Sequence, residues 1–358
     1  MPSDDTGFTQ PEAASATPAP DHAILFELGW QPFFAQQTGM DELAITPPAR
    51  VTEVHRSGLR VLGDGIDMVV PPRADATVGD WLLIDQQLPS ASRLLERKSV
   101  IKRRAAGHDV SVQLIAANID TAFIVTSCND DFNVARLERY VALAFEAGVT
   151  PVILLTRADL CRNVATYVTQ AEAISDAVPV IALDAKSEDP LTLLAPWCKP
   201  GRTVAFLGSS GVGKSTLTNA LSARAVAATR SIREDDSRGR HTTSHRQLHI
   251  IPGRCAVLDT PGVRELQLTD AESGVAEVFS DLDELAADCR FNDCTHVAEP
   301  GCAVLAALGK GVIDGARLAR WRKLAAEERH NTATLAKRRS KDKAFGKMVK
   351  QARKHKSR

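Results

Sequence analysis

A glycine-rich segment in the middle of the chain constrains its fold most strongly. Residues 208–215 match the phosphate-binding loop pattern G-x-x-x-x-G-K-[ST] at every specified position. The short apolar run over 203–207 predicts a buried strand before the loop, and the spacing of apolar residues over 215–221 predicts a helix after it. The motif needs this context, because the N–H groups of the loop and of the helix N-terminus hold an anion together. We therefore expect a nucleotide-binding α/β domain, with 207 residues preceding its phosphate loop.

The phosphate loop supplies both phosphate contacts and a metal ligand. We expect Lys214 to bind the β- and γ-phosphates and to act in catalysis, and Ser215 to bind Mg²⁺. Asp259 follows a second apolar strand, where its carboxylate can hold Mg²⁺ through water, and the N–H of Gly262 can sense the γ-phosphate. The nucleotide contacts expected from the loop and the residue after it are Gly208, Ser209, Ser210, Gly211, Val212, Gly213, Lys214, Ser215 and Thr216.

Predicted strands and helices alternate from residue 122 onwards, which indicates a doubly wound α/β sheet. Strands are expected over 123–126, 152–155, 180–183, 203–207, 247–251 and 255–258, and helices over 134–146 and 162–177. Two of these strands end in turns with polar residues: Thr156, Arg157 and Asp159 in one, and Asp184, Ala185 and Lys186 in the next. The Asp159 carboxylate can accept two hydrogen bonds from guanine N1 and N2, and N–H groups of the second turn can meet guanine O6.

A polar segment over residues 235–246 lies between the phosphate loop and Asp259. Such a segment can become ordered around a γ-phosphate and Mg²⁺. We expect Thr242 or Thr243 to provide a second hydroxyl ligand to Mg²⁺, and assign Thr243 to catalysis as well. His241 is a candidate for positioning water, with a merely solvated loop histidine as the alternative. No water-orienting glutamine follows Gly262, so intrinsic hydrolysis should be slow and open to stimulation by a partner.

Short strands precede the α/β region. Apolar residues over 51–54, 59–62, 67–70 and 81–84 are separated by glycine and proline turns, which predicts a small β-barrel. An OB-fold fits its size, and an SH3-like barrel is the alternative. Basic residues at the end of this region suggest either a nucleic-acid face or an edge strand kept soluble by charge. They are Arg93, Arg97, Lys98, Lys102, Arg103 and Arg104.

Three cysteines and a histidine cluster after the α/β region. Cys289, Cys294, His296 and Cys302 form the pattern C-x₄-C-x-H-x₅-C. Three thiolates and one imidazole suit a closed, tetrahedral structural Zn²⁺ site, which leaves no open position for catalysis at the metal. Helices are expected beyond it, over 303–308 and 316–326.

Charge is distributed unevenly along a chain whose net charge is zero. Residues 337–358 hold 11 Lys and Arg and one acidic residue, which leaves 33 basic and 43 acidic residues before them. A basic tail of this kind favours RNA, and a solvated tail without a partner is the alternative. The Pro-, Ala-, Ser- and Thr-rich residues 1–22 are expected to be disordered. With no membrane span and no signal peptide evident, we expect a cytoplasmic monomer.

Taken together, these motifs resemble the RsgA (YjeQ) family of circularly permuted GTPases, in which the guanine motifs precede the phosphate loop. The resemblance covers roughly residues 50–330 and includes segments 116–120, 208–215, 239–243 and 259–265. Thr156 and Arg157 depart from the usual Asn-Lys-x-Asp motif, and Asp184 stands where a serine is typical. Thr156 cannot reproduce the asparagine amide contact, so guanine preference is expected with some relaxation.

The resemblance implies an architecture and a function. It implies an OB-fold-like barrel (45–110), a circularly permuted P-loop GTPase domain (111–270), a zinc-binding helical module (271–336) and a basic tail (337–358). It implies a GTPase that uses GTP/GDP, Mg²⁺ and one structural Zn²⁺, and that assists late maturation of the small ribosomal subunit with subunit-stimulated hydrolysis. Arg317, Arg320, Arg322 and Lys323 would then face rRNA. The alternatives are a nucleotide-dependent RNA-binding module with little turnover, and a P-loop kinase or ATPase.

Overall fold

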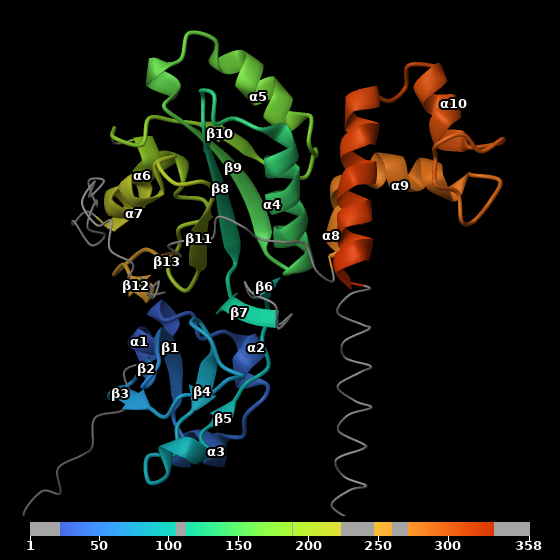
Figure 1. Cartoon of the computed structure of the whole chain (residues 1–358). Helices are drawn as coiled ribbons and strands as arrows, with labels where there is room; N and C mark the ends of the chain where they lie inside the picture. Colours follow the sequence, from blue (N-terminus) through green and yellow to red (C-terminus); the bar gives the residue numbers. More distant parts are fainter. Residues whose placement is uncertain (1–21, 105–111, 188, 223–246, 260–270, 333–358) are drawn as a thin grey trace, which may run out of the picture.

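The computed structural model describes residues 22–104, 112–187, 189–222, 247–259 and 271–332 (Figure 1). The expected disordered extension, the polar segment over 235–246 with His241 and Thr243, Gly262, and the basic tail over 337–358 lie outside these residues, apart from residue 22.

A mostly parallel sheet forms the centre of the molecule. Its order is β10 (Val180–Ala182), β9 (Thr150–Thr156), β8 (Thr121–Ser127), β11 (Thr203–Leu207), β13 (Ala256–Asp259) and β12 (Gln247–Ile250). The first five are parallel and β12 is antiparallel to β13. All seven residues of β8 are buried, which explains the apolar run over residues 122–125 at its centre.

Helices cover both faces of this sheet, as Figure 1 shows. Ile124 of β8 belongs to one apolar cluster with α4 (Val134–Glu146) and residues beside α5 (Val164–Glu172). Phe123 and Val125 belong to a second cluster with residues of α7 (Lys214–Ser222) and Leu194, which follows α6 (Asp189–Leu193). Alternate residues of the strand thus face opposite layers. The predicted doubly wound α/β sheet is confirmed, including the bounds of α4.

The N-terminal region begins with three short helices, α1 (His22–Glu27), α2 (Pro32–Ala35) and α3 (Met40–Ile45), and continues into antiparallel strands. β1 (Pro48–His55) pairs with β2 (Gly58–Gly63) and β4 (Trp81–Leu83). β2 pairs with β3 (Ile66–Val70), and β4 pairs with β5 (Arg93–Leu94), which follows the short helix η1 (Pro89–Ala91). The four strands predicted from the sequence are present, whereas the OB-fold assignment stays a prediction.

This region is joined to the central sheet through its first strand. Glu53 of β1 pairs with Gln247 of β12, so the two sheets are continuous. Gln247 Nε2 also donates to Glu53 Oε1 at 3.0 Å. β6 (Val100–Arg104) and β7 (Val112–Ala117) pair in a separate two-stranded sheet, one on either side of residue 110, where the sequence places a domain boundary.

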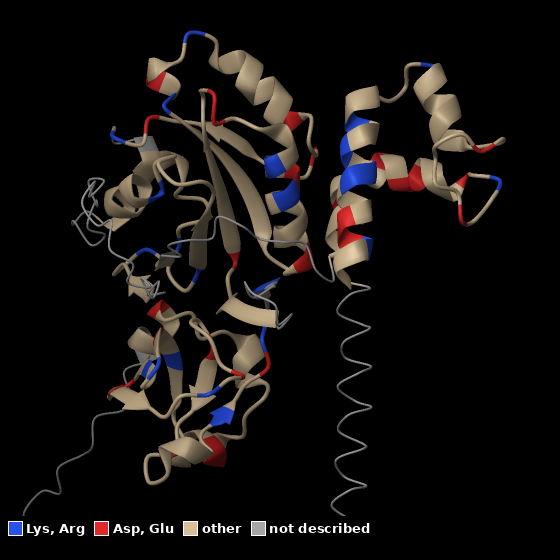
Figure 2. Cartoon of the chain, in the orientation of Figure 1, with Lys and Arg blue, Asp and Glu red and all other residues tan. Residues whose placement is uncertain are grey.

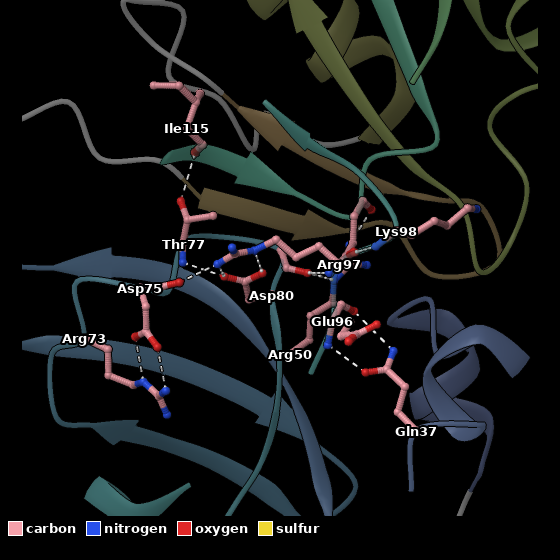
Figure 3. A network of polar contacts seen from close by, with 12 residues as sticks. Gln37, Arg50, Arg73, Asp75, Thr77, Asp80, Glu96, Arg97, Lys98 and Ile115 are labelled. Carbon is pink, nitrogen blue, oxygen red and sulfur yellow. Dashed lines mark hydrogen bonds and ion pairs between the residues drawn. The ribbon is translucent and has the colours of Figure 1, made fainter. Parts of the chain in front are cut away.

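A buried polar network fills the junction between the two regions (Figure 3). The fully buried guanidinium of Arg50 donates to the carbonyl oxygens of Leu28, Gly79 and Asn118 and to Thr203 Oγ1 at the start of β11. Burial lowers the pKa of Arg50 to about 10, while the charges of Asp120 and Asp80 oppose that shift. Arg50 thus ties β1 to the strand that leads into the phosphate loop.

The basic residues predicted at the end of the strand region turn out to be used within the fold. Arg97 donates to both carboxylate oxygens of buried Asp80 at 2.7 and 2.8 Å, and Lys98 pairs with Asp120 at 2.7 Å. Arg93 pairs with Glu42, and Arg103 donates to Gln113. Lys102 is exposed, and nothing is described of the Arg104 side chain. Four of the six side chains are therefore engaged within the fold, and the choice between a nucleic-acid face and a charged edge strand is not tested by these contacts.

The C-terminal region packs against α4. α8 (Glu272–Val278) approaches so closely that a Cβ on Gly274 would lie 2.0 Å from the Ala142 carbonyl oxygen. α9 (Ser280–Ala287), α10 (Ala303–Gly309) and a helix over residues 315–332 follow. Figure 2 shows Lys and Arg along the last helix and Asp and Glu on α9.

Two arginines of the helix over 315–332 face inward. Arg320 Nε lies 2.9 Å from both carboxylate oxygens of buried Glu138 on α4. Arg317 pairs with Asp281 at 2.7 Å and lies over the ring of Phe279. The expectation that Arg317 and Arg320 face rRNA is thereby corrected, because internal carboxylates take up their hydrogen bonds.

Candidate nucleotide site and metal centre

The phosphate loop connects β11 to α7 and lies against the carboxyl end of β8. Gly208 adopts a φ of 139°, and a Cβ there would lie 2.2 Å from the Val125 carbonyl oxygen. No larger residue fits this approach, which explains the glycine at the start of the motif. Lys214 Nζ donates to the carbonyl oxygens of Gly208, at 2.8 Å, and Ser209, so its ammonium lies over the loop. The expected strand, loop and helix are all present.

The turn after β9 contacts the phosphate loop directly. Thr156 Oγ1 lies 2.7 Å from the Val212 carbonyl oxygen, and Arg157 Nη2 donates to the Gly211 carbonyl oxygen at 2.8 Å. Arg157 adopts a left-handed φ of 57°, which turns the chain into the short helix η2 (Ala158–Leu160). Asp159 is exposed within η2. Its carboxylate is therefore accessible to a ligand beside the loop.

A second turn follows β10 at the same edge of the sheet. Lys186 N donates to Asp184 Oδ1 at 2.8 Å, so the Asp184 side chain closes its own turn. Ala185 is buried and its Cβ lies 3.7 Å from the position of a Cβ on Gly213. Because β9, β10 and β11 are parallel, their carboxyl ends bring both turns and the phosphate loop together, as expected for a nucleotide site in an open α/β sheet.

The expected Mg²⁺ ligands are only partly described. Asp259 ends β13, and the register of Ala205 with Leu258 places Asp259 level with Phe206, just before the phosphate loop. Ser215 is exposed in the first turn of α7. An oxygen donor set of hydroxyl and carboxylate suits Mg²⁺. Thr243, His241 and Gly262 lie outside the described residues, so their assigned roles remain predictions.

The cysteine cluster forms a compact donor set. The ligand atoms of Cys289, Cys294, His296 and Cys302 all lie within 4.8 Å of one another. Cys289 Sγ lies 3.8 Å from Cys302 Sγ, and each of these sulfurs lies 3.5 Å from His296 Nδ1. A tetrahedron with Zn–S bonds of about 2.3 Å has edges of about 3.8 Å. The four side chains therefore fit a structural Zn²⁺ ion.

The loop between these ligands is held by a residue that the sequence patterns do not single out. Glu299 accepts hydrogen bonds from the N–H groups of Thr295, Val297 and Ala298. The hydrogen bond from the Thr295 hydroxyl, together with those from the N–H groups of Thr295 and Val297, holds the pKa of Glu299 far below its usual range. They close the loop around His296, whose φ of 58° is left-handed. The His296 ring lies 5.1 Å from that of Trp321, which joins the cluster to the last helix.

Comparison with known proteins agrees with this geometry. The family model described as RsgA GTPase matches residues 94–269. A relative from Vibrio vulnificus (strain CMCP6), "Small ribosomal subunit biogenesis GTPase RsgA 2", is 46% identical over 330 residues, which is 90% of this chain and 93% of the relative. "Small ribosomal subunit biogenesis GTPase RsgA" from Mesorhizobium japonicum is 50% identical over 317 residues, 86% of this chain and 91% of the relative.

Solved structures share the fold at lower identity. YjeQ from Thermotoga maritima has a TM-score of 0.56 at 22% identity, over 78% of this chain and 97% of that protein. YloQ, described as a circularly permuted GTPase, has a TM-score of 0.54 at 23% identity, over 80% of this chain and 96% of that protein. The phosphate loop, the two turns before it and the identity to curated relatives over most of the chain lead to one conclusion: the chain belongs to the RsgA family of small ribosomal subunit biogenesis GTPases.

Proposed function

We propose that this chain binds GTP at the edge formed by the phosphate loop and the turns after β9 and β10, and hydrolyses it to GDP at a rate raised by the small ribosomal subunit. The observation that carries the proposal is the meeting of three segments, around Thr156, Ala185 and Gly213, that lie far apart in the sequence. Each segment contacts a different part of the nucleotide. The loop binds the phosphates, Asp159 accepts hydrogen bonds from guanine N1 and N2, and the N–H groups of the turn containing Ala185 donate to guanine O6.

The chemistry follows from how these groups are held. Lys214 bonds to two loop carbonyl oxygens, and we infer that it exchanges them for β- and γ-phosphate oxygens when GTP binds. Mg²⁺, when bound between Ser215 and Asp259, supplies charge that offsets the charge of the phosphates. Thr243 and His241 are the candidates for completing the metal shell and positioning water. A stimulating partner would complete this site, because no glutamine follows Gly262.

The remaining assignments concern partners and location. We propose that the N-terminal barrel, the zinc-binding helical module and the basic tail over 337–358 contact rRNA of the maturing small subunit at a late step. We also propose that the chain acts as a cytoplasmic monomer. No helix among the described residues is both long and apolar enough to cross a membrane. The donor distances around His296 support the metal, and the 11 basic residues of the tail support the rRNA contact.

Phosphate release measured with and without purified small subunits tests this function. Wild-type protein should release phosphate slowly alone and faster with subunits, and Lys214→Ala should lose the activity under both conditions. No stimulation, together with unchanged turnover in Lys214→Ala, would instead favour an RNA-binding module with little turnover. The observation that favours this second candidate is that no glutamine follows Gly262.

A further inference from the structure

Thr156 occupies an unusual place between two segments of the nucleotide site. Its side chain is buried at the end of β9, and its hydroxyl oxygen lies 2.7 Å from the Val212 carbonyl oxygen and 3.1 Å from the Thr126 carbonyl oxygen. A hydroxyl has one proton to donate, so the shorter contact, to the phosphate loop, is the better hydrogen bond. The Thr156 hydroxyl is thus engaged in hydrogen bonding within the protein.

The next residue makes a matching contact. Arg157 Nη2 donates to the Gly211 carbonyl oxygen, so consecutive residues of the turn hold consecutive carbonyl groups of the phosphate loop. The Thr156 methyl group also packs near Gly213, at 3.5 Å from the position of a Cβ there. The turn that carries Asp159 is therefore held to the phosphate loop by two hydrogen bonds, and the Thr156 methyl group lies beside Gly213.

We propose that Thr156 is a positioning residue that sets the spacing between the base and phosphate subsites, and that it takes no part in choosing the base. This inference rests on the proposed function, because it requires a nucleotide that spans both subsites. A ligand with two anchoring points binds best when the distance between them is fixed in advance. Loosening the contact at Thr156 should weaken the binding of every nucleotide that uses both subsites. Selectivity for guanine should still depend on Asp159.

A pair of isosteric substitutions separates this role from a general effect of removing a buried hydroxyl. Thr156→Val removes the donor to Val212 and keeps the side-chain volume, and Thr156→Ser keeps the donor. Thr126→Val is the matched control, because Thr126 is equally buried on the adjacent strand and its hydroxyl finds no hydrogen-bond partner among the described residues. Dissociation constants for fluorescent GDP and GTP, with ADP and XDP as competitors, provide the measurement at a temperature where circular dichroism shows all variants folded.

Thr156→Val should lower the affinity for GDP and GTP about tenfold. This is the loss expected when a buried carbonyl loses its hydrogen bond. The ratio of GDP to ADP and XDP affinities should stay that of the wild type. Thr156→Ser should restore affinity to within about twofold, and Thr126→Val should leave it unchanged. Should the valine variant not fold, Thr156→Ala replaces it, with the same expected loss.

Two results would overturn the inference. Wild-type affinity in Thr156→Val would show that the contact with the phosphate loop does not matter for binding. A changed ratio between bases would make Thr156 a base-selecting residue. Failure of the proposed function looks different, because wild-type protein would then bind no guanine nucleotide or would prefer ADP.

Discussion

Replacing Arg50 tests how the N-terminal strands are fixed to the GTPase sheet. Arg50→Met keeps most of the side-chain length and removes the guanidinium, so the carbonyl oxygens of Leu28, Gly79 and Asn118 and the Thr203 hydroxyl each lose a donor. At about 1 kcal/mol for each lost bond, the free energy of unfolding should fall by roughly 3–5 kcal/mol. This is a large loss for a single substitution.

Urea unfolding followed by circular dichroism gives the stability, and the midpoints should be compared directly because a chain of this size need not unfold in one step. Arg60→Met is the matched control. Arg60 pairs with two carboxylates, Glu53 and Asp67, yet its side chain is 47% exposed, so its loss should shift the midpoint very little. Equal shifts for both variants, or no shift for Arg50→Met, would refute the reasoning that burial makes this junction strong.

Further predictions address the metal, the base, the junction and the tail. Cys294→Ser, like removal of Zn²⁺ by a chelator, should lower the thermal midpoint, because the binding energy of a structural metal is folding energy; purified wild-type protein without zinc would contradict this. Asp159→Asn should weaken GTP far more than XTP in competition assays, and equal losses would count against the guanine assignment. Although burial raises the pKa of Asp120, hydrogen bonds from Lys98 and Thr203 N lower it overall. Its stabilising effect is thus present above the unfolded pKa of about 3.9 and lost as pH falls through the lower folded value, so Asp120→Asn should flatten the acid side of the stability profile. Deleting 337–358 should reduce RNA affinity and its salt dependence, and an unchanged salt slope would mean that the tail makes no phosphate contacts.

Local patterns in the sequence predict the parallel sheet, the phosphate-loop segment and the grouping of the three cysteines with His296, whereas the roles of the nucleotide-site residues stay predictions. Three of these patterns involve residues that are close together in the sequence: the apolar run of β8, the helical spacing of α4 and the spacing of the cysteines. The structure contains the strand, the helix and the cysteine cluster that they predict. The family resemblance is confirmed by relatives that cover most of the chain.

These patterns do not predict contacts between segments that are distant in the sequence. Arg320 and Arg97 look like surface charges in the sequence, because nothing nearby shows that Glu138 and Asp80 lie opposite them. The hydroxyl of Thr156 likewise contacts the carbonyl oxygen of Val212, which is 56 residues away in the sequence. From the sequence alone, a threonine in place of asparagine indicates only the loss of an amide contact to the base. Such pairs depend on topology, which periodicity does not encode.

The ion pair between Glu138 and Arg320 also has a consequence for how the chain is synthesised. The two residues are 182 positions apart, so at about 5–20 residues per second Glu138 is translated roughly 10–40 seconds before its partner. During that interval the face of α4 that receives α8 and the last helix is uncovered in the nascent chain. The GTPase unit therefore cannot reach its final packing until the helix over 315–332 has left the ribosome, and a chain that stops before residue 315 would expose the part of this face that this helix covers to chaperones and proteases.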